Sequence, residues 1–343
     1  MTTARLPVAA LAGLACAVAA ACAGEPPIER IGGRTMGSTW EAKFVRSVAP
    51  DRVRAVVQAE LDACDLAFSQ WRDDSEIARC NRHASTEPFA VTPRFAGVLQ
   101  LALRIAAATD GAFDPTVKPL SDLYRAAKQD PAHHLDAAAL AAAAARVDFR
   151  RVEVRDGAVR KQRPDVQLDL DGLVAGAAAD AIAVRLHALG VHAFFLEITG
   201  EVLAHGEKAP GVPWLAGVVD PASDAVGDEQ PIRSLALRDR ALCTSGDYRN
   251  GFVSDGTFVH HVFDPRTGRN APHRVVSVSV LARSAAVADA LGTAFLVLGD
   301  EGAAPLLPRL QQLDEPPGGE LGALFLIATA DGGLRPAEFA WPR

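Results

Sequence analysis

The sequence predicts an α+β protein with a single domain, in which mixed or antiparallel sheets pack with helices. Helical and strand segments alternate irregularly along the chain, whereas a doubly wound parallel sheet would require steady βαβ units. No linker or internal repeat divides residues 22–343. Hydrophobic residues make up 49% of the 343 positions, which is enough apolar material for one large core.

The N-terminal segment is a candidate export signal. Arg5 is its only early charge, and an apolar run follows to Ala21. We expect residues 1–21 to be removed as a signal peptide, because so short a run does not span a bilayer permanently. The small residues directly before Cys22 resemble a lipoprotein processing site, which would leave the protein lipid-anchored through Cys22 at the periplasmic face of the inner membrane. A plain Ala-x-Ala cleavage would instead release a soluble protein.

Composition excludes nucleic acid as a partner. The chain carries 35 Lys and Arg against 42 Asp and Glu, a net charge of −7, and no basic run that could neutralise phosphates.

Of the 5 cysteines, Cys16 and Cys22 belong to the export segment, and the odd remainder argues against a disulfide framework. Cys64 and Cys80 either pair in an oxidising compartment or remain buried free thiols, as expected for Cys243.

Apolar residues at steps of three and four predict the helices. Val53, Val57 and Leu61, for example, fall on one face of such a helix. An alanine-rich stretch is included because Ala is the best helix former, and Gly190 marks one helix end. The predicted helices are residues 51–68, 95–105, 136–146, 173–189 and 285–298.

Alternating and β-branched segments predict the strands. Asp156-Gly157 lies between two of them and predicts a tight hairpin, because both positions tolerate positive φ. The predicted strands are residues 152–155, 158–162, 166–170, 193–198, 214–219, 232–238, 258–263, 275–282 and 323–328.

Asp289 and Thr293 form a candidate metal-binding pair on the helix predicted at 285–298. Residues four apart project from one helix face, so their oxygens point towards one place. Magnesium prefers such oxygen ligands and completes its shell with water and substrate phosphates. Taken alone, a solvated aspartate and a threonine bonded to the helix backbone explain the pair equally well.

A helix start and a histidine are two further candidate functional features. The strand predicted at 166–170 runs into a helix start at Gly172, where backbone amides can bind phosphate, although neither a Walker loop nor a GxGxxG motif is present. His261 follows a strand with Asp264 nearby and is a candidate general base, with a purely structural role as the alternative. Ser245 lacks a GxSxG context and is not expected to be a nucleophile.

These features occur within a set of segments whose order resembles the ApbE family, the FAD:protein FMN transferases. The segments are Met36–Trp40, Phe68–Ile77 with Asn81, Gly111–Val117 with Pro119–Leu120, Leu168–Asp180, Thr244–Tyr248, His261–Gly268 and Asp289–Thr293. The resemblance spans about residues 33–300. It implies one α+β domain that binds FAD as substrate with Mg²⁺, cleaves its pyrophosphate, and joins FMN through a phosphoester to a threonine of an exported or membrane-bound flavoprotein, releasing AMP.

The resemblance also implies roles for individual residues. Asp289 and Thr293 match side-chain ligands of the metal, and Gly172 matches a position that contributes its backbone carbonyl. His261 matches the histidine beside the reacting phosphate. The positions that match FAD-binding residues are Met36, Trp71, Ala112, Phe113, Asp114, Asp169, Ala175 and Val262.

The chain departs from the family pattern in residues 171–177. Family members commonly have Gly-Gly-Ile-Ala-Lys-Gly-Tyr where this chain has Asp-Gly-Leu-Val-Ala-Gly-Ala. Ala175 therefore lacks a charged side chain that would face the cofactor, and Asp171 adds a negative charge. At an effective dielectric of about 20, one unit charge at about 4 Å is worth about 4 kcal/mol. Thr199 and Glu197 also replace a glycine and an asparagine.

Because of these departures, three functions remain open. The first is FMN transfer to a protein threonine. The second is hydrolysis of FAD to FMN and AMP in the same fold. The third is a non-catalytic periplasmic protein that binds flavin or assists flavoprotein maturation.

Overall fold

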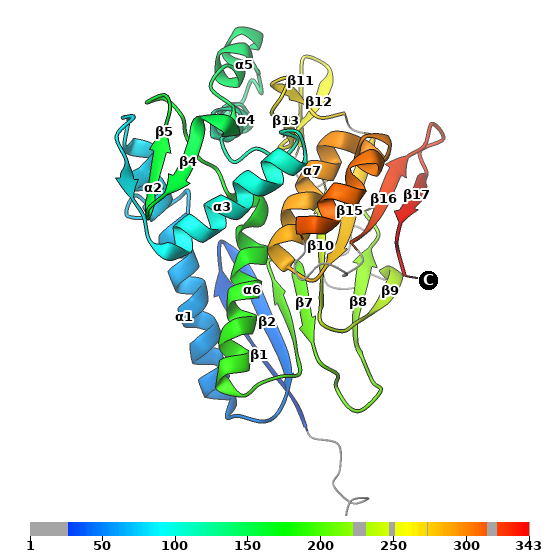
Figure 1. Cartoon of the computed structure of the whole chain (residues 1–343). Helices are drawn as coiled ribbons and strands as arrows, with labels where there is room; N and C mark the ends of the chain where they lie inside the picture. The colour runs from blue at the N-terminus through cyan, green and yellow to red at the C-terminus, as the bar shows by residue number, and fades with distance from the viewer. Residues whose placement is uncertain (1–26, 222–230, 247–250, 273, 314–320, 343) are drawn as a thin grey trace, which may run out of the picture.

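The computed structural model describes residues 27–221, 231–246, 251–272, 274–313 and 321–342 (Figure 1). The predicted signal peptide and Cys22 lie outside these ranges.

An antiparallel sheet of eight strands crosses the molecule in the order β1-β2-β6-β7-β10-β15-β16-β17. Every neighbouring pair in it is antiparallel. Its strands are β1 (Ile28–Thr35), β2 (Ser38–Val45), β6 (Phe194–Ile198), β7 (Glu201–His205), β10 (Arg240–Gly246), β15 (Val275–Ala282), β16 (Gly322–Ala328) and β17 (Leu334–Phe339).

Smaller sheets and the helices surround this sheet. The smaller sheets contain β3 (Phe89–Ala90), β5 (Ala158–Lys161) and β4 (Val152–Arg155); β8 (Trp214–Val219) and β9 (Pro231–Leu237); β11 (Gly251–Ser254) and β12 (Thr257–His260); and β13 (Phe263–Asp264) and β14 (Arg269–Asn270). The helices are α1 (Pro50–Phe68), α2 (Glu76–Arg82), α3 (Pro93–Ala108), α4 (Lys118–Gln129), α5 (Ala137–Ala144), α6 (Asp171–Leu189), α7 (Ala285–Ala303) and α8 (Leu307–Leu310).

The two faces of the large sheet are covered differently. Val278 and Val280 of β15 belong to the main core, which includes the buried residues of α1, α6 and α7. Leu281 of the same strand belongs to a second cluster with Trp214, where the β8–β9 hairpin packs on the opposite face. This alternation follows from side chains pointing to opposite faces along a strand. The predicted α+β class is confirmed, and the large sheet is antiparallel.

All five predicted helices are present, with α6 beginning at Asp171, two residues earlier than expected. The hairpin predicted at Asp156-Gly157 joins β4 to β5, and both residues have positive φ, 52° and 71°. The strand predicted at 258–263 is divided, because the chain bends at His261 between β12 and β13. The other predicted strands agree with the structure to within one residue at each end, apart from the segment described next.

The prediction of a strand at 166–170 was wrong. This largely buried segment does not join a sheet, and side chains bond several of its backbone groups. The Asn81 amide donates to the Leu168 carbonyl at 2.8 Å and accepts from the Leu168 N–H at 2.6 Å. Lys161 Nζ donates to the carbonyl of Val166 at 3.2 Å.

The structure also distinguishes a Cys64–Cys80 disulfide from free thiols. Cys64, Cys80 and Cys243 are all buried and free, so Cys64 and Cys80 do not pair in this structure. Burial raises the pKa of both Cys64 and Cys80 to about 11, which keeps their thiols protonated and unreactive.

Close contact between α6 and α7 organises the helical layer. A Cβ on Gly176 would lie 2.3 Å from the carbonyl oxygen of Ala285, so only glycine allows the two backbones to meet. Asp180 of α6 accepts from the N–H groups of Ala285 and Ala286 at 2.8 and 3.0 Å and so caps α7. Both the position and the start of α7 are therefore fixed by α6.

Replacing Gly176 with alanine is expected to destabilise the protein by about 2–3 kcal/mol, because the added methyl meets backbone that cannot move aside. Gly97 in α3 is the matched control, since nothing lies within 4 Å of the position that a Cβ there would take. Gly97→Ala is expected to stabilise by about 0.5–1 kcal/mol through helix propensity. Urea denaturation measures both variants, and equal effects would contradict the close contact.

Candidate active site

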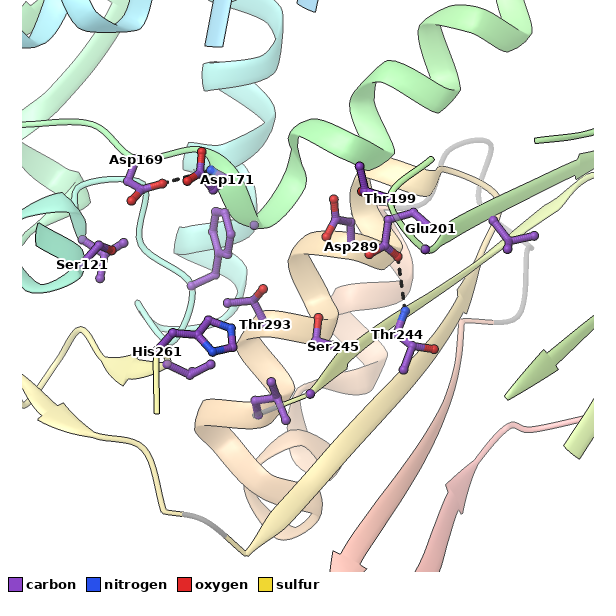
Figure 2. A pocket seen from close by; sticks show the side chains of 18 of the residues that line it. Ser121, Asp169, Asp171, Thr199, Glu201, Thr244, Ser245, His261, Asp289 and Thr293 are labelled. Atoms are coloured by element: carbon purple, nitrogen blue, oxygen red, sulfur yellow. Dashed lines mark hydrogen bonds between the residues drawn. The ribbon is translucent and has the colours of Figure 1, made fainter. Parts of the chain in front are cut away.

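A cavity of about 1290 Å³ opens where α4, α6 and α7 meet the ends of β6, β7 and β10 (Figure 2). Typical small-molecule sites occupy about 300–1,000 Å³, so this cavity has room for a dinucleotide-sized ligand. Its wall combines carboxylates, hydroxyl groups and aromatic rings. Among the lining residues are Asp169, Asp171, Thr199, Glu201, Thr244, Ser245, His261, Asp289 and Thr293.

Three oxygen-bearing groups converge at one corner of the cavity. Asp289 and Thr293 lie one turn apart on α7, as their spacing predicted. Thr293 Oγ1 lies 3.0 Å from the position that a Cβ on Gly172 would take, so the glycine allows the hydroxyl to approach the start of α6. The Gly176 N–H donates to Asp289 Oδ2 at 3.0 Å. In a regular helix that N–H is the partner of the Gly172 carbonyl, so Asp289 competes for it and leaves this carbonyl able to accept.

Two carboxyl groups with raised pKa values dominate this corner. Burial raises the pKa of Asp289 to about 7; the Gly176 N–H opposes the rise and the charge of Asp180 adds to it. Burial likewise raises the pKa of Glu201 well above its usual range, and the charge of Asp289 adds to the effect. Glu201 Oε2 accepts from the Thr244 N–H at 3.2 Å. Asp289 is buried and Glu201 is half-buried, and neighbouring carboxyl groups disfavour each other's charged form, so a cation at this corner would stabilise both.

A tight turn forms another part of the wall. Asp114 accepts from the Thr116 N–H at 2.7 Å and from the Phe149 N–H at 2.9 Å, which ties the turn to the neighbouring 3₁₀ helix. Burial raises the pKa of Asp114, although these hydrogen bonds oppose the rise. Asp114 thereby holds Ala112 and Phe113 at the cavity.

Of the two adjacent histidines, only His261 lines the cavity. It lies at the bend after β12, and Figure 2 shows its ring directed towards Thr293. His260 is buried, with Nε2 2.8 Å from the carbonyl oxygen of Ala271, and is therefore structural. Arg266 Nε and Nη2 donate hydrogen bonds to the two carboxylate oxygens of Asp264 at 2.8 and 2.9 Å.

The structure brings most of the predicted site residues to this cavity. Those lining it are Trp71, Ala112, Phe113, Asp114, Asp169, Gly172, His261, Val262, Asp289 and Thr293. Met36 and Ala175 are not among the described residues that line it. Met36 occupies the turn between β1 and β2 with a φ of 49°, and Ala175 is partly buried on α6. Their roles in binding FAD remain predictions.

Sequence reasoning missed the contribution of α4. Ser121, Tyr124, Arg125 and Lys128 of this helix all line the cavity. Their spacing of three, four and seven residues defines one helix face and was visible in the sequence. Glu201 was also missed, and its signal is weaker, because a single carboxylate at the start of a strand is common.

Fold and cavity together define a single-domain α+β protein with a large, acid-lined site that has room for a dinucleotide-sized ligand. The model of the ApbE family matches residues 36–314, and the chain belongs to this family. The FAD:protein FMN transferase of Klebsiella pneumoniae (strain 342) is 35% identical over 277 residues, which is 78% of each chain. That of Vibrio cholerae (strain O395) is 34% identical over 285 residues, 81% of this chain and 84% of the relative.

Solved structures agree with this assignment. The apo form of the flavinyl transferase ApbE of Pseudomonas stutzeri superposes with a TM-score of 0.79 at 30% identity and covers 91% of this chain and 94% of its own. The flavin transferase ApbE of Vibrio cholerae gives 0.76 at 30% identity and covers 91% and 97%. The family resemblance found in the sequence is thereby confirmed.

Asp289→Asn is expected to stabilise the ligand-free protein by about 1–3 kcal/mol at pH 8 and to have little effect near pH 4. The folded-state pKa of Asp289 is raised to about 7. Its contribution to stability is therefore fully present below its unfolded pKa near 4 and is lost as the pH rises through 7. Thermal denaturation at several pH values tests this, with the exposed Asp62→Asn as control. A pH-independent difference for Asp289→Asn would contradict it.

Proposed function

We propose that the protein is an FAD:protein FMN transferase that modifies a threonine of a target flavoprotein. The threonine oxygen bonds to the phosphorus of the FMN half, the bond from that phosphorus to the bridging oxygen breaks, and AMP leaves with that oxygen. The observation that carries this proposal is the convergence of Asp289, Thr293 and Gly172 at one corner of a dinucleotide-sized cavity. The family membership and the names of the relatives support it.

The magnesium ion implied by the family fits that corner chemically. A buried carboxylate, a hydroxyl and a backbone carbonyl are hard oxygen donors, and Mg²⁺ commonly takes only one or two carboxylates from the protein. Within the described ranges, no group of three or more His, Cys, Asp or Glu is placed to hold a metal. The protein would therefore supply part of the shell, and phosphate and water the rest. When bound, Mg²⁺ supplies charge neutralisation at the pyrophosphate.

Residues of the chain provide position and proton transfer. Trp71 offers a flat apolar face to a ring system, and Phe113 lines the wall beside Gly172. His261 takes the proton from the attacking hydroxyl, because an imidazole titrates near neutral pH and this one lies on the cavity wall. Holding both reactants in one cavity provides most of the remaining rate advantage.

The decisive assay incubates the protein with FAD, Mg²⁺ and a purified flavoprotein target that contains the acceptor threonine. Transfer is expected to give AMP and a fluorescent target whose mass has increased by one FMN unit. AMP with free FMN would indicate hydrolysis, and no AMP would indicate a binding protein; either result contradicts the proposal.

His261→Ala is expected to lower the transfer rate by about 10²–10⁴-fold while FAD still binds, because a general base typically contributes that much. Transfer is followed by the fluorescence of the target, and binding by titration with FAD. His134→Ala is the matched control, since that exposed histidine pairs with Asp255 and is not part of the cavity wall. Full transfer activity in His261→Ala would make the histidine structural.

We also propose that the mature protein is exported and lipid-anchored through Cys22. The apolar run and the small residues before Cys22 support this proposal. Mass spectrometry of the mature N-terminus is expected to find a diacylated Cys22, and Cys22→Ser is expected to abolish membrane attachment. An unmodified N-terminus at another residue would contradict the anchor.

A further inference from the structure

The guanidinium of Arg125 joins three segments that are far apart in the sequence. Its Cζ lies 5.6 Å from the centroid of the Trp71 ring, within cation–π range. Its Nη2 lies 3.3 Å from Asp169 Oδ2 and 3.1 Å from Asp171 Oδ2. Nη1 bonds Asp122 Oδ1 of the same helix at 3.1 Å. All of these side chains except Asp122 line the cavity.

The indole held in this way is unusually exposed. Trp71 retains 79% of its accessible surface, although a tryptophan normally buries most of its apolar area. It follows the end of α1 in a loop, so α1 itself does not determine where the ring points. The guanidinium covers one ring face and leaves the opposite face for another planar group.

The carboxylates explain why Arg125 can hold the ring in place. A guanidinium is planar and presents several donors in a fixed fork, so bonds to three carboxylates fix its orientation as well as its position. The side chain of Arg125 is only 27% exposed, which limits screening by water. It also places a positive charge next to Asp171, in a part of the wall where residues 171–177 contain no basic residue.

We propose that Arg125 is a positioning residue for the planar ring system of the substrate. It fixes the indole of Trp71 at the cavity, and the ring of FAD stacks on the face that the guanidinium leaves open. This inference rests on the proposed function, because it takes FAD as the ligand. Arg125 positions the ring through Trp71, so part of its effect on binding is expected to disappear once the indole is removed; its charge beside Asp171 acts apart from the indole.

The test is a double-mutant cycle with FAD and Mg²⁺, in which binding is followed by flavin fluorescence. Arg125→Gln and Trp71→Leu are each expected to weaken binding by about 10-fold. The double variant is expected to lose clearly less than the product of the two single losses, because the part of the Arg125 effect that runs through Trp71 is already gone. Arg125→Lys keeps the charge but loses the fork, and is expected to lose about 5-fold.

Arg150→Gln is the matched control. Its guanidinium lies 4.6 Å from the Phe149 ring centroid, but Arg150 is not part of the cavity wall, so FAD binding is expected to be unchanged. A second readout needs no ligand. The difference in tryptophan emission between wild type and Trp71→Leu isolates the signal of Trp71, and this signal is expected to change in Arg125→Gln but not in Arg150→Gln.

The outcomes separate this inference from the proposed function. Wild-type affinity and an unchanged Trp71 signal in Arg125→Gln would overturn the role of Arg125 and leave the transferase proposal intact. Additive losses in the double variant would show that Arg125 acts apart from Trp71, which also overturns the inference. A wild-type protein that does not bind FAD would overturn the proposed function, and the inference with it.

Discussion

The contact between α6 and α7 is the constraint on which the rest of the site depends. Gly176 allows the two backbones to meet, and Asp180 caps the first turn of α7 from the side of α6. Asp289 then returns the contact by accepting from the Gly176 N–H. Because these bonds run in both directions between the helices, Asp289 and Thr293 cannot move relative to Gly172 without breaking the packing. The convergence of their oxygens is a property of this helix pair.

This arrangement stores unfavourable electrostatic energy. Asp289 is buried and Glu201 is half-buried near it, and the loss of water raises the pKa of both. Such groups reduce the stability of the ligand-free protein, and this stability is restored when a cation or another positive partner binds. Sites that bind charged ligands commonly sacrifice stability in this way. The large apolar core on the helical face of the sheet supplies the stability that the site gives up.

The sequence predicted the elements whose signals are local. Periodicity located α1 and α3, alanine content located α5, α6 was predicted to end at Gly190, α7 was predicted at its observed start, and Asp156-Gly157 located a hairpin. The prediction of a strand at 166–170 was wrong, because the side chain of Asn81, which is distant in sequence, bonds the backbone of this segment where a neighbouring strand would. The helix α4 was missed although its signal is local, because Leu120, Leu123, Tyr124 and Ala127 have helical spacing, as its polar face does. The order of the strands was likewise invisible, because register and neighbours are set by tertiary packing.

The candidate site shows the same division between local and tertiary information. Asp289 and Thr293 share one helix turn, so spacing alone brings them together, whereas Arg125 and Glu201 reach the cavity only through the fold. The departure in residues 171–177 illustrates the consequence. From the sequence of residues 171–177 alone, Asp171 and the absence of a basic side chain at Ala175 would make the cavity wall more negative than in other family members. In the folded chain, Arg125 from α4 lies 3.1 Å from Asp171 Oδ2 and offsets that charge. Charge balance belongs to the whole wall of a cavity, so a missing charge in one motif can be supplied by another element.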